Sequence, residues 1–472
     1  MAPTNLQYPG AHVGEGASRR HVASGAMSAL PERPPFALRA RLLSPTGDGG
    51  VLDEADGVLG IDATGRISRV GRWSEADARG TLDLRPMVLL PGLVDLHAHL
   101  PQIPNAGLGS GLDLLTWLDR YIFPLERAYD RTVAERQAPA AFRAFAAAGT
   151  TTVVAYAALW EDSTDAAFAA AEAHGIRAVI GKVMMDRLTY DTDIPPNEIL
   201  ETSLRQSDAL AARWHGRDDG RLQYAFTPRF AVSCSAEMLR ESAALAVRHD
   251  AYWQTHLSED AGEIGEVRRL FPAARDYLDV YDRAGGLAAR AILAHAIHLS
   301  DREVRRLAEA GAGIAHCPAS NLFLSSGLMP LSAYRRAGIR VGLGSDVAAG
   351  PEVSLFTVMR AGAVTQRVLE LTGGAGRESA VHGTEWLRLA TLDGARVLGL
   401  DASIGSLEVG KEADLIAVDP RLTTPLPGDE PPLESADDVM SRLVFRPHPN
   451  MVRAAWVRGR LLAGPPGLDG IG

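Results

Sequence analysis

Two histidines separated by a single residue lie at the end of an apolar run in the first quarter of the chain. His97 and His99 close the segment 91–99, PGLVDLHAH. Because alternate side chains of a β-strand share one face, the two imidazoles are expected to point the same way. Such a pair can hold one metal ion, although a pair that is only hydrogen-bonded at a strand end has the same spacing.

Three further potential metal ligands occur where other predicted strands end. They are His256, His295 and Asp346, at the ends of the apolar runs 252–257, 291–295 and 340–345. In a barrel of parallel strands these ends meet on one face, so the three side chains are expected to converge with the first two histidines. Three or four imidazoles and a carboxylate, with one position left for water, are typical of a catalytic metal site.

Glu259 is the candidate for moving protons beside such a metal. It follows His256 by three residues. A bound metal lowers the pKa of water toward ~7, and a neighbouring carboxylate can then carry protons as a general acid and base. A carboxylate in this position could equally be a helix N-cap or part of a salt bridge.

The elements that must position these residues alternate between strand and helix patterns. Apolar strands are predicted at 91–97, 151–156, 177–184, 221–227, 252–257, 291–295, 313–317 and 340–345. Helical patterns between them include 132–148, 164–174, 236–248, 302–310 and 353–371. This alternation predicts a parallel sheet, and eight units favour a closed (β/α)8 TIM-type barrel over residues 91–401. An open doubly wound sheet is the alternative.

The two ends of the chain have a β pattern with turns instead. We expect residues 38–90 and 402–472 to pair into one small discontinuous β-sandwich beside the barrel. Residues 1–37 are rich in Gly, Ala, Ser, Pro and Arg without periodicity, which predicts a disordered leader.

Composition narrows the class of protein. The 472 residues carry a formal net charge of −10, which disfavours nucleic-acid binding. The sequence contains no apolar run of ~18 residues, so no membrane span is predicted. It also lacks a basic region followed by an apolar core, so no signal peptide is predicted. Cys234 and Cys317 are the only cysteines and form no disulfide framework. We therefore expect a cytoplasmic protein that binds neither nucleic acid nor membrane.

Several motifs resemble one known family. The segment 91–99, with His256, His295 and Gly344-Ser345-Asp346, is similar to the amidohydrolase superfamily of metal-dependent hydrolases. Within it the resemblance is to the guanine deaminases, over about residues 90–365. The motifs that carry it are HLPQ (99–102), KVMMDR (182–187), TPRF (227–230), QTHLSE (254–259), YLDVY (277–281) and HCPASNLFLSSG (316–327).

The resemblance implies a role for each matching position. Zinc, one ion per chain, would be held by His97, His99, His256 and Asp346, with His295 as a further ligand or as a hydrogen-bonding partner of the attacking water. Glu259 would move a proton to the purine ring, and Asp346 would relay the proton of the water to the leaving amine. Gln102, Arg229 and Phe230, beside His256, would hold the base. The implied reaction converts guanine to xanthine and ammonia, and the implied assembly is a homodimer.

Two segments differ from the usual guanine deaminase pattern. They are 103–111 and 347–353, and both follow predicted barrel strands, so they could line the substrate pocket. A deaminase of a related ring, such as 8-oxoguanine or a pterin, and a hydrolase of a cyclic amide are therefore alternatives. A non-catalytic barrel is disfavoured because all five metal-site positions and Glu259 are present.

Overall fold

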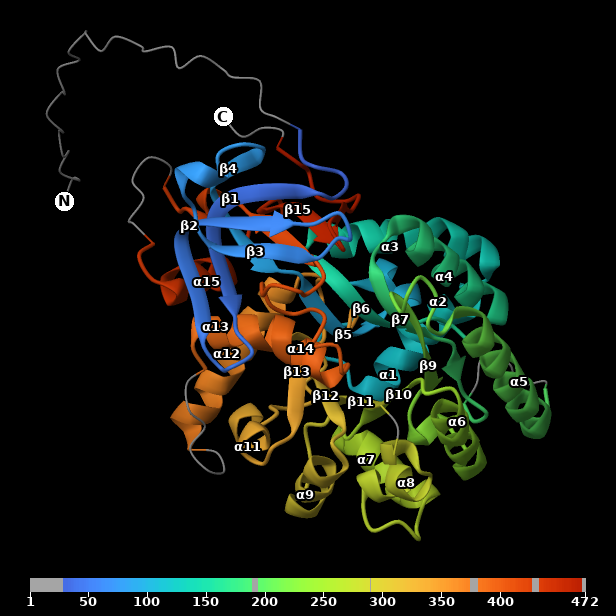
Figure 1. The fold of residues 1–472 in the computed structure, drawn as a ribbon. Helices are drawn as coiled ribbons and strands as arrows, with labels where there is room; N and C mark the ends of the chain where they lie inside the picture. Colours follow the sequence, from blue (N-terminus) through green and yellow to red (C-terminus); the bar gives the residue numbers. More distant parts are fainter. Residues whose placement is uncertain (1–28, 189–193, 289, 374–380, 427–432, 469–472) are drawn as a thin grey trace, which may run out of the picture.

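The computed structural model describes residues 29–188, 194–288, 290–373, 381–426 and 433–468. A barrel surrounded by helices and a smaller β-sheet make up the molecule (Figure 1). The first and last strands of the chain, blue and red in Figure 1, lie together in the smaller sheet. Residues 1–28 of the predicted leader lie outside the described residues. The predicted end of the leader at residue 37 is wrong, because a strand begins at Phe36 and the carbonyl of Pro31 accepts from the indole of Trp456 at 2.9 Å.

The barrel contains eight parallel strands in sequence order, with one short additional strand. They are β5 (Leu93–His99), β6 (Thr150–Tyr156), β7 (Arg177–Gly181), β9 (Leu222–Pro228), β10 (Tyr252–Leu257), β11 (Arg290–His295), β12 (Gly313–His316) and β13 (Arg340–Leu343), and β8 (Val183–Met184) pairs with β9. The predicted (β/α)8 fold is confirmed. The single strand predicted over 177–184 is wrong, because the chain leaves the β6–β7 ladder at Gly181 and resumes pairing with β9 at Val183.

The last strand meets the first through the chain that follows it. The amide of Asp346 donates to the carbonyl of His97 at 2.7 Å. The buried carboxylate of Asp95 accepts from the amides of His97 (3.2 Å) and Ser345 (2.9 Å) through one oxygen. These bonds close the barrel and exclude the open doubly wound sheet. They also tie the segment that carries Asp346 to the strand that carries the first two histidines.

Helices cover the outside of the barrel, as Figure 1 shows. They are α1 (Leu114–Trp117), α2 (Phe123–Ala128), α3 (Arg131–Ala147), α4 (Glu161–His174), α5 (Pro196–Trp214), α6 (Ala236–Arg248), α7 (Ala261–Leu270), α8 (Tyr277–Arg283), α9 (Asp301–Ala310), α10 (Pro318–Phe323), α11 (Leu331–Arg336), α12 (Leu355–Thr372), α13 (Gly383–Arg388), α14 (Gly394–Val397) and α15 (Ala436–Phe445). Several begin at a polar cap. Ser235 accepts from the amide of Met238 and Ser300 from that of Glu303, which fixes the first turns of α6 and α9.

The smaller sheet joins both ends of the chain. Its order is β16-β15-β14-β4-β1-β2-β3, and every pair is antiparallel except β1–β4. The strands are β1 (Phe36–Pro45), β2 (Val51–Ile61), β3 (Ile67–Arg72), β4 (Thr81–Pro91), β14 (Leu415–Val418), β15 (Val452–Val457) and β16 (Arg460–Leu461). They form one hydrogen-bonded sheet with its own hydrophobic core, which includes Leu38, Leu59, Leu89 and Trp456. The predicted pairing of both chain ends is thus confirmed, and the predicted β-sandwich takes the form of one seven-stranded sheet in the described residues.

Buried charges link the sheet to the barrel. Arg177 begins β7, at the end of the barrel opposite the predicted metal ligands. Its guanidinium pairs with Asp414 at 3.0 Å and Glu412 at 2.5 Å, next to β14.

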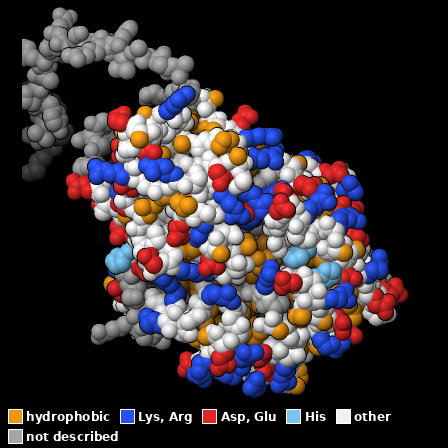
Figure 2. All heavy atoms as spheres, viewed as in Figure 1, with side chains coloured by type: hydrophobic (Ala, Val, Ile, Leu, Met, Phe, Trp, Pro, Cys, Tyr) orange, Lys and Arg blue, Asp and Glu red, His pale blue; other side chains and the backbone are white. Residues whose placement is uncertain are grey.

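On the molecular surface, the face in Figure 2 intersperses basic side chains with acidic ones. None of the helices in the described part of the chain is long and apolar enough to cross a membrane.

Candidate active site

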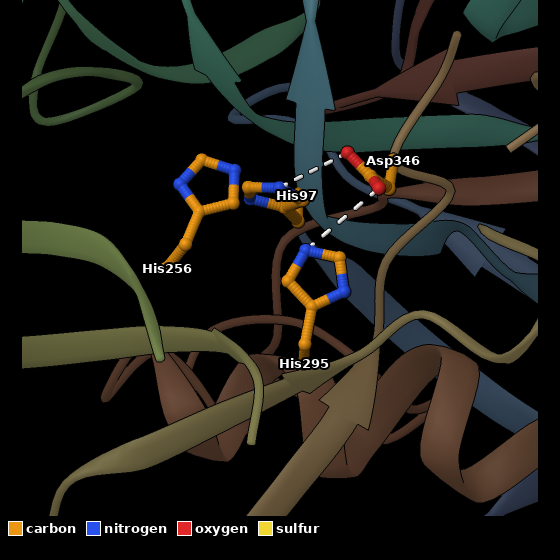
Figure 3. A group of neighbouring side chains, drawn as sticks. All are labelled: His97, His256, His295 and Asp346. Atoms are coloured by element: carbon orange, nitrogen blue, oxygen red, sulfur yellow. Dashed lines mark ion pairs between the residues drawn. The ribbon is translucent and has the colours of Figure 1, made fainter. Parts of the chain in front are cut away.

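All five predicted metal-site residues lie at the carboxyl ends of barrel strands. His97 and His99 are on β5, His256 on β10 and His295 at the end of β11. Asp346 follows β13. The backbone of His295 (φ 69°) and of Asp346 (φ 48°) lies in the left-handed region, where the chain turns away from each strand. Figure 3 shows the side chains of His97, His256, His295 and Asp346 directed toward one another.

The donor atoms of four of these side chains have the spacing of a metal site. Nε2 of His99 lies 3.2 Å from Nε2 of His97, 3.3 Å from Nε2 of His256 and 3.4 Å from Oδ1 of Asp346. Oδ1 of Asp346 is 3.2 Å from Nε2 of His97. Ligands held tetrahedrally at 2.0–2.1 Å from a zinc ion would lie about 3.3 Å apart. The four side chains are buried, and the four separations given above match this spacing.

Hydrogen bonds orient two of the imidazoles so that Nε2 faces the centre. Nδ1 of His256 donates to the carbonyl of Arg229 at 2.7 Å, and Nδ1 of His295 donates to Oδ1 of Asn321 at 2.9 Å. Because both acceptors are oxygens, Nδ1 carries the hydrogen and Nε2 keeps its lone pair. Within the described residues, Nε2 of His295 is buried and makes no hydrogen bond, and it faces Oε2 of Glu259 at 3.3 Å. This nitrogen is placed to coordinate a metal ion or to accept a hydrogen bond from a water bound to it.

The charge states also suit a metal. Burial lowers the pKa of His99 to about 3 and lowers the pKa of His97 and of His256. Burial acts to raise the pKa of Asp346, but the neighbouring His97 and His99 outweigh it, and the pKa lies well below its usual value. Neutral imidazoles and an ionised carboxylate are the forms that coordinate a cation.

Glu259 lies beside this cluster. Its side chain is 2% exposed, and Oε2 is 3.3 Å from Nε2 of His295. Burial, followed by the charge of Asp346, raises the pKa of Glu259 well above its usual value. The N-cap of α7 is Asp260. The carboxyl group of Glu259 is therefore available at the site to hold and deliver a proton.

A pocket opens at the cluster. The predicted base-binding residues Gln102, Arg229, Phe230 and His256 all line it, and so does Glu259. Its other walls include the apolar side chains of Leu114, Trp117, Leu118 and Leu324. Apolar walls with a few fixed polar groups are typical of sites for flat heterocycles. Of the two unusual segments, 347–353 contributes Ala349 and 103–111 contributes none of the lining residues.

Three supporting residues were not predicted. Asn321 orients His295, and Ser320 donates to Oδ2 of Asp346 at 2.5 Å. Both lie in the motif 316–327, but the sequence assigned them no role. The third residue, Glu126 on α2, contacts both Gln102 and Arg229. No spacing connects it to them, because the contacts arise from the fold alone.

Comparison with known proteins identifies the family. The profile of the amidohydrolase family matches residues 88–462. The chain belongs to the amidohydrolase family. It is 38% identical over 416 residues to a probable guanine deaminase from Deinococcus radiodurans, covering 86% of this chain and 92% of that protein. The resemblance found in the motifs is therefore confirmed.

Solved structures agree with this assignment. The guanine deaminase of E. coli has a TM-score of 0.82 and 33% identity, with 90% of this chain and 99% of that chain covered. The guanine deaminase of C. acetobutylicum, solved with guanine in its active site, has a TM-score of 0.82 and 28% identity, with coverages of 91% and 100%. The similarity thus includes both the barrel and the sheet built from the chain ends.

Proposed function

We propose that this amidohydrolase removes the amino group of guanine with water, giving xanthine and ammonia. The observation that carries the proposal is one cavity in which metal-ligating side chains, a protonatable Glu259 and the polar pair Gln102 and Arg229 meet. The guanine deaminases among its relatives support the same reaction.

The proposal includes one zinc ion per chain. His97, His99, His256 and Asp346 would hold it, since their donor atoms have the spacing that a tetrahedral zinc requires. When bound, zinc supplies a hydroxide nucleophile at neutral pH by lowering the pKa of water to about 7.

The remaining steps belong to side chains of this protein. Glu259, whose pKa burial and the charge of Asp346 raise well above its usual value, protonates the ring nitrogen beside C2 of guanine. Asp346 accepts the proton of the attacking water and passes it to the leaving amine. His295 lies between these carboxylates, 3.3 Å from Glu259 and 3.8 Å from Asp346, and holds the water in place. The C2–N bond then breaks and ammonia leaves, while the hydroxyl proton at C2 returns to Glu259, so that C2 becomes the carbonyl of xanthine.

Arg229 and Gln102 hold the polar edge of the base, and Phe230 packs against the ring. We further propose that the protein acts in the cytoplasm, as part of purine breakdown or salvage, and that it is a homodimer. Exposed apolar side chains on one face of α12, Val364, Val368 and Leu371, support an association of copies, which light scattering would test.

A substrate panel tests the proposed reaction. Ammonia release by the purified protein is compared for guanine, 8-oxoguanine, a pterin and adenine, and it should be fastest with guanine. Adenine should be rejected by a factor of about 10⁴ or more, because it has no amine at C2 and it lacks the carbonyl that the site is built to hydrogen-bond. Strong turnover of another ring beside weak turnover of guanine would replace guanine as the substrate and leave the hydrolytic chemistry in place.

A further inference from the structure

A buried carboxylate joins the two residues proposed to hold the polar edge of the base. Oε1 of Glu126 accepts from Nε2 of Gln102 at 2.7 Å and from Nη1 of Arg229 at 2.7 Å. Oε2 accepts from the same Nη1 at 2.5 Å. Glu126 is 0% exposed, Gln102 1% and Arg229 2%. Glu126 itself is absent from the cavity wall, whereas its two partners line it.

These contacts fix which atoms remain for a substrate. An ionised carboxylate only accepts hydrogen bonds, so the amide nitrogen of Gln102 must face Glu126. The carbonyl oxygen of that amide, an acceptor, is the end left for the cavity. Arg229 uses Nη1 on Glu126 and keeps its other N–H groups as donors. The cavity therefore presents an acceptor from Gln102 and a donor from Arg229.

We propose that Glu126 is a positioning residue that selects the substrate edge by fixing this donor–acceptor order. The inference rests on the proposed deamination at C2. It identifies the ring edge that distinguishes a substrate from other purines with an amine at C2. An acceptor with a donor complements a lactam, in which a ring N–H adjoins a carbonyl. Guanine offers this pair as N1–H and O6. The purine 2,6-diaminopurine has the same leaving amine at C2, but its N1 accepts and its C6 amine donates.

The variant Glu126→Gln tests whether Glu126 fixes the donor–acceptor order of Gln102 and Arg229. A glutamine has nearly the same shape, but it can donate as well as accept, so the amide of Gln102 is free to turn over. Arg229 also loses its anionic partner. We expect kcat/KM for guanine to fall about ten- to a hundredfold, mainly through KM, as expected when a charged hydrogen bond is removed. The preference for guanine over 2,6-diaminopurine should shrink at least about tenfold.

Two further variants separate positioning from stability. Glu126→Asp keeps a side chain that only accepts, so it should preserve the preference even where kcat/KM for guanine falls. Asp414→Asn breaks the buried ion pair with Arg177 at the opposite end of the barrel. It should lower the melting temperature and leave the preference unchanged.

The ratio of the two kcat/KM values does not depend on how much of a variant is folded. An equal loss on both purines in Glu126→Gln would overturn the inference, as would loss of the preference in Glu126→Asp to the extent seen in Glu126→Gln. The wild type is assayed with guanine first. No turnover there would refute the proposed function, whereas an active wild type with an unchanged ratio in the variant refutes only the role of Glu126.

Discussion

At the residue scale, the chemistry depends on small groups of atoms whose orientation other residues fix. The five metal-site residues were predicted because each ends a strand, and parallel strands place their ends together. Their orienting partners could not be predicted in the same way. Asn321 and Glu126 contact side chains 26 and 24 residues away through the packing of helices against the barrel. No periodic pattern marks such contacts.

Glu259→Gln should retain the fold and the metal but lose most turnover. The amide keeps the shape of the side chain but cannot carry the proton, and general acid–base catalysis is typically worth ~10²–10⁴ in rate. Steady-state kinetics with guanine and metal analysis of the same sample provide the measurement. Glu237→Gln, on the exposed surface of α6, is the matched control. Activity of Glu259→Gln within about threefold of wild type would assign Glu259 a structural role.

At the element scale, strands and capped helices were predictable where local signals are strong. The prediction of 236–248 matches α6, whose first turn Ser235 caps. The predicted start at 164 is wrong for α4, which begins at Glu161 after Trp160, a residue without a side-chain cap hydrogen bond. The break between β7 and β8 was also missed, because the apolar run continues on both sides of Lys182.

Lys182, between β7 and β8, should give the stability of the protein a pH dependence. Its side chain is 1% exposed, with Nζ 3.0 Å from Oγ of Ser203, and burial lowers its pKa to about 7. The unfolded chain therefore binds more protons than the folded chain between pH 7 and about 10. The contribution of Lys182 to the free energy of unfolding should rise with pH in that window, by up to about 1.4 kcal/mol per pH unit.

Lys182→Met removes this titration. Thermal unfolding at pH 7 and pH 9.5 should show the wild type gaining stability relative to the variant as the pH rises. Lys411→Met, at the other lysine of the chain, is the control for the loss of a lysine side chain. Parallel pH profiles for wild type and Lys182→Met would mean that Lys182 stays charged in the folded protein.

At the scale of the whole molecule, the chain ends meet in one sheet beside the barrel. Two separated β patterns predicted this pairing, but not the strand order, which depends on contacts between residues hundreds of positions apart. Ile416 pairs with Leu90 in β4 and Ala455 in β15. The domain boundaries at 91 and 401 stay predictions. The family resemblance came from six motifs, four of which contribute residues to one cavity.

The proposed hydrolysis of guanine depends on a metal ion held by His97, His99, His256 and Asp346. Metal content and activity, measured on the same sample, test this dependence. The purified protein should contain about one zinc per chain. Prolonged chelation should abolish xanthine formation, and added zinc should restore it in proportion to the zinc bound. Full turnover of guanine by a metal-free preparation would contradict the account.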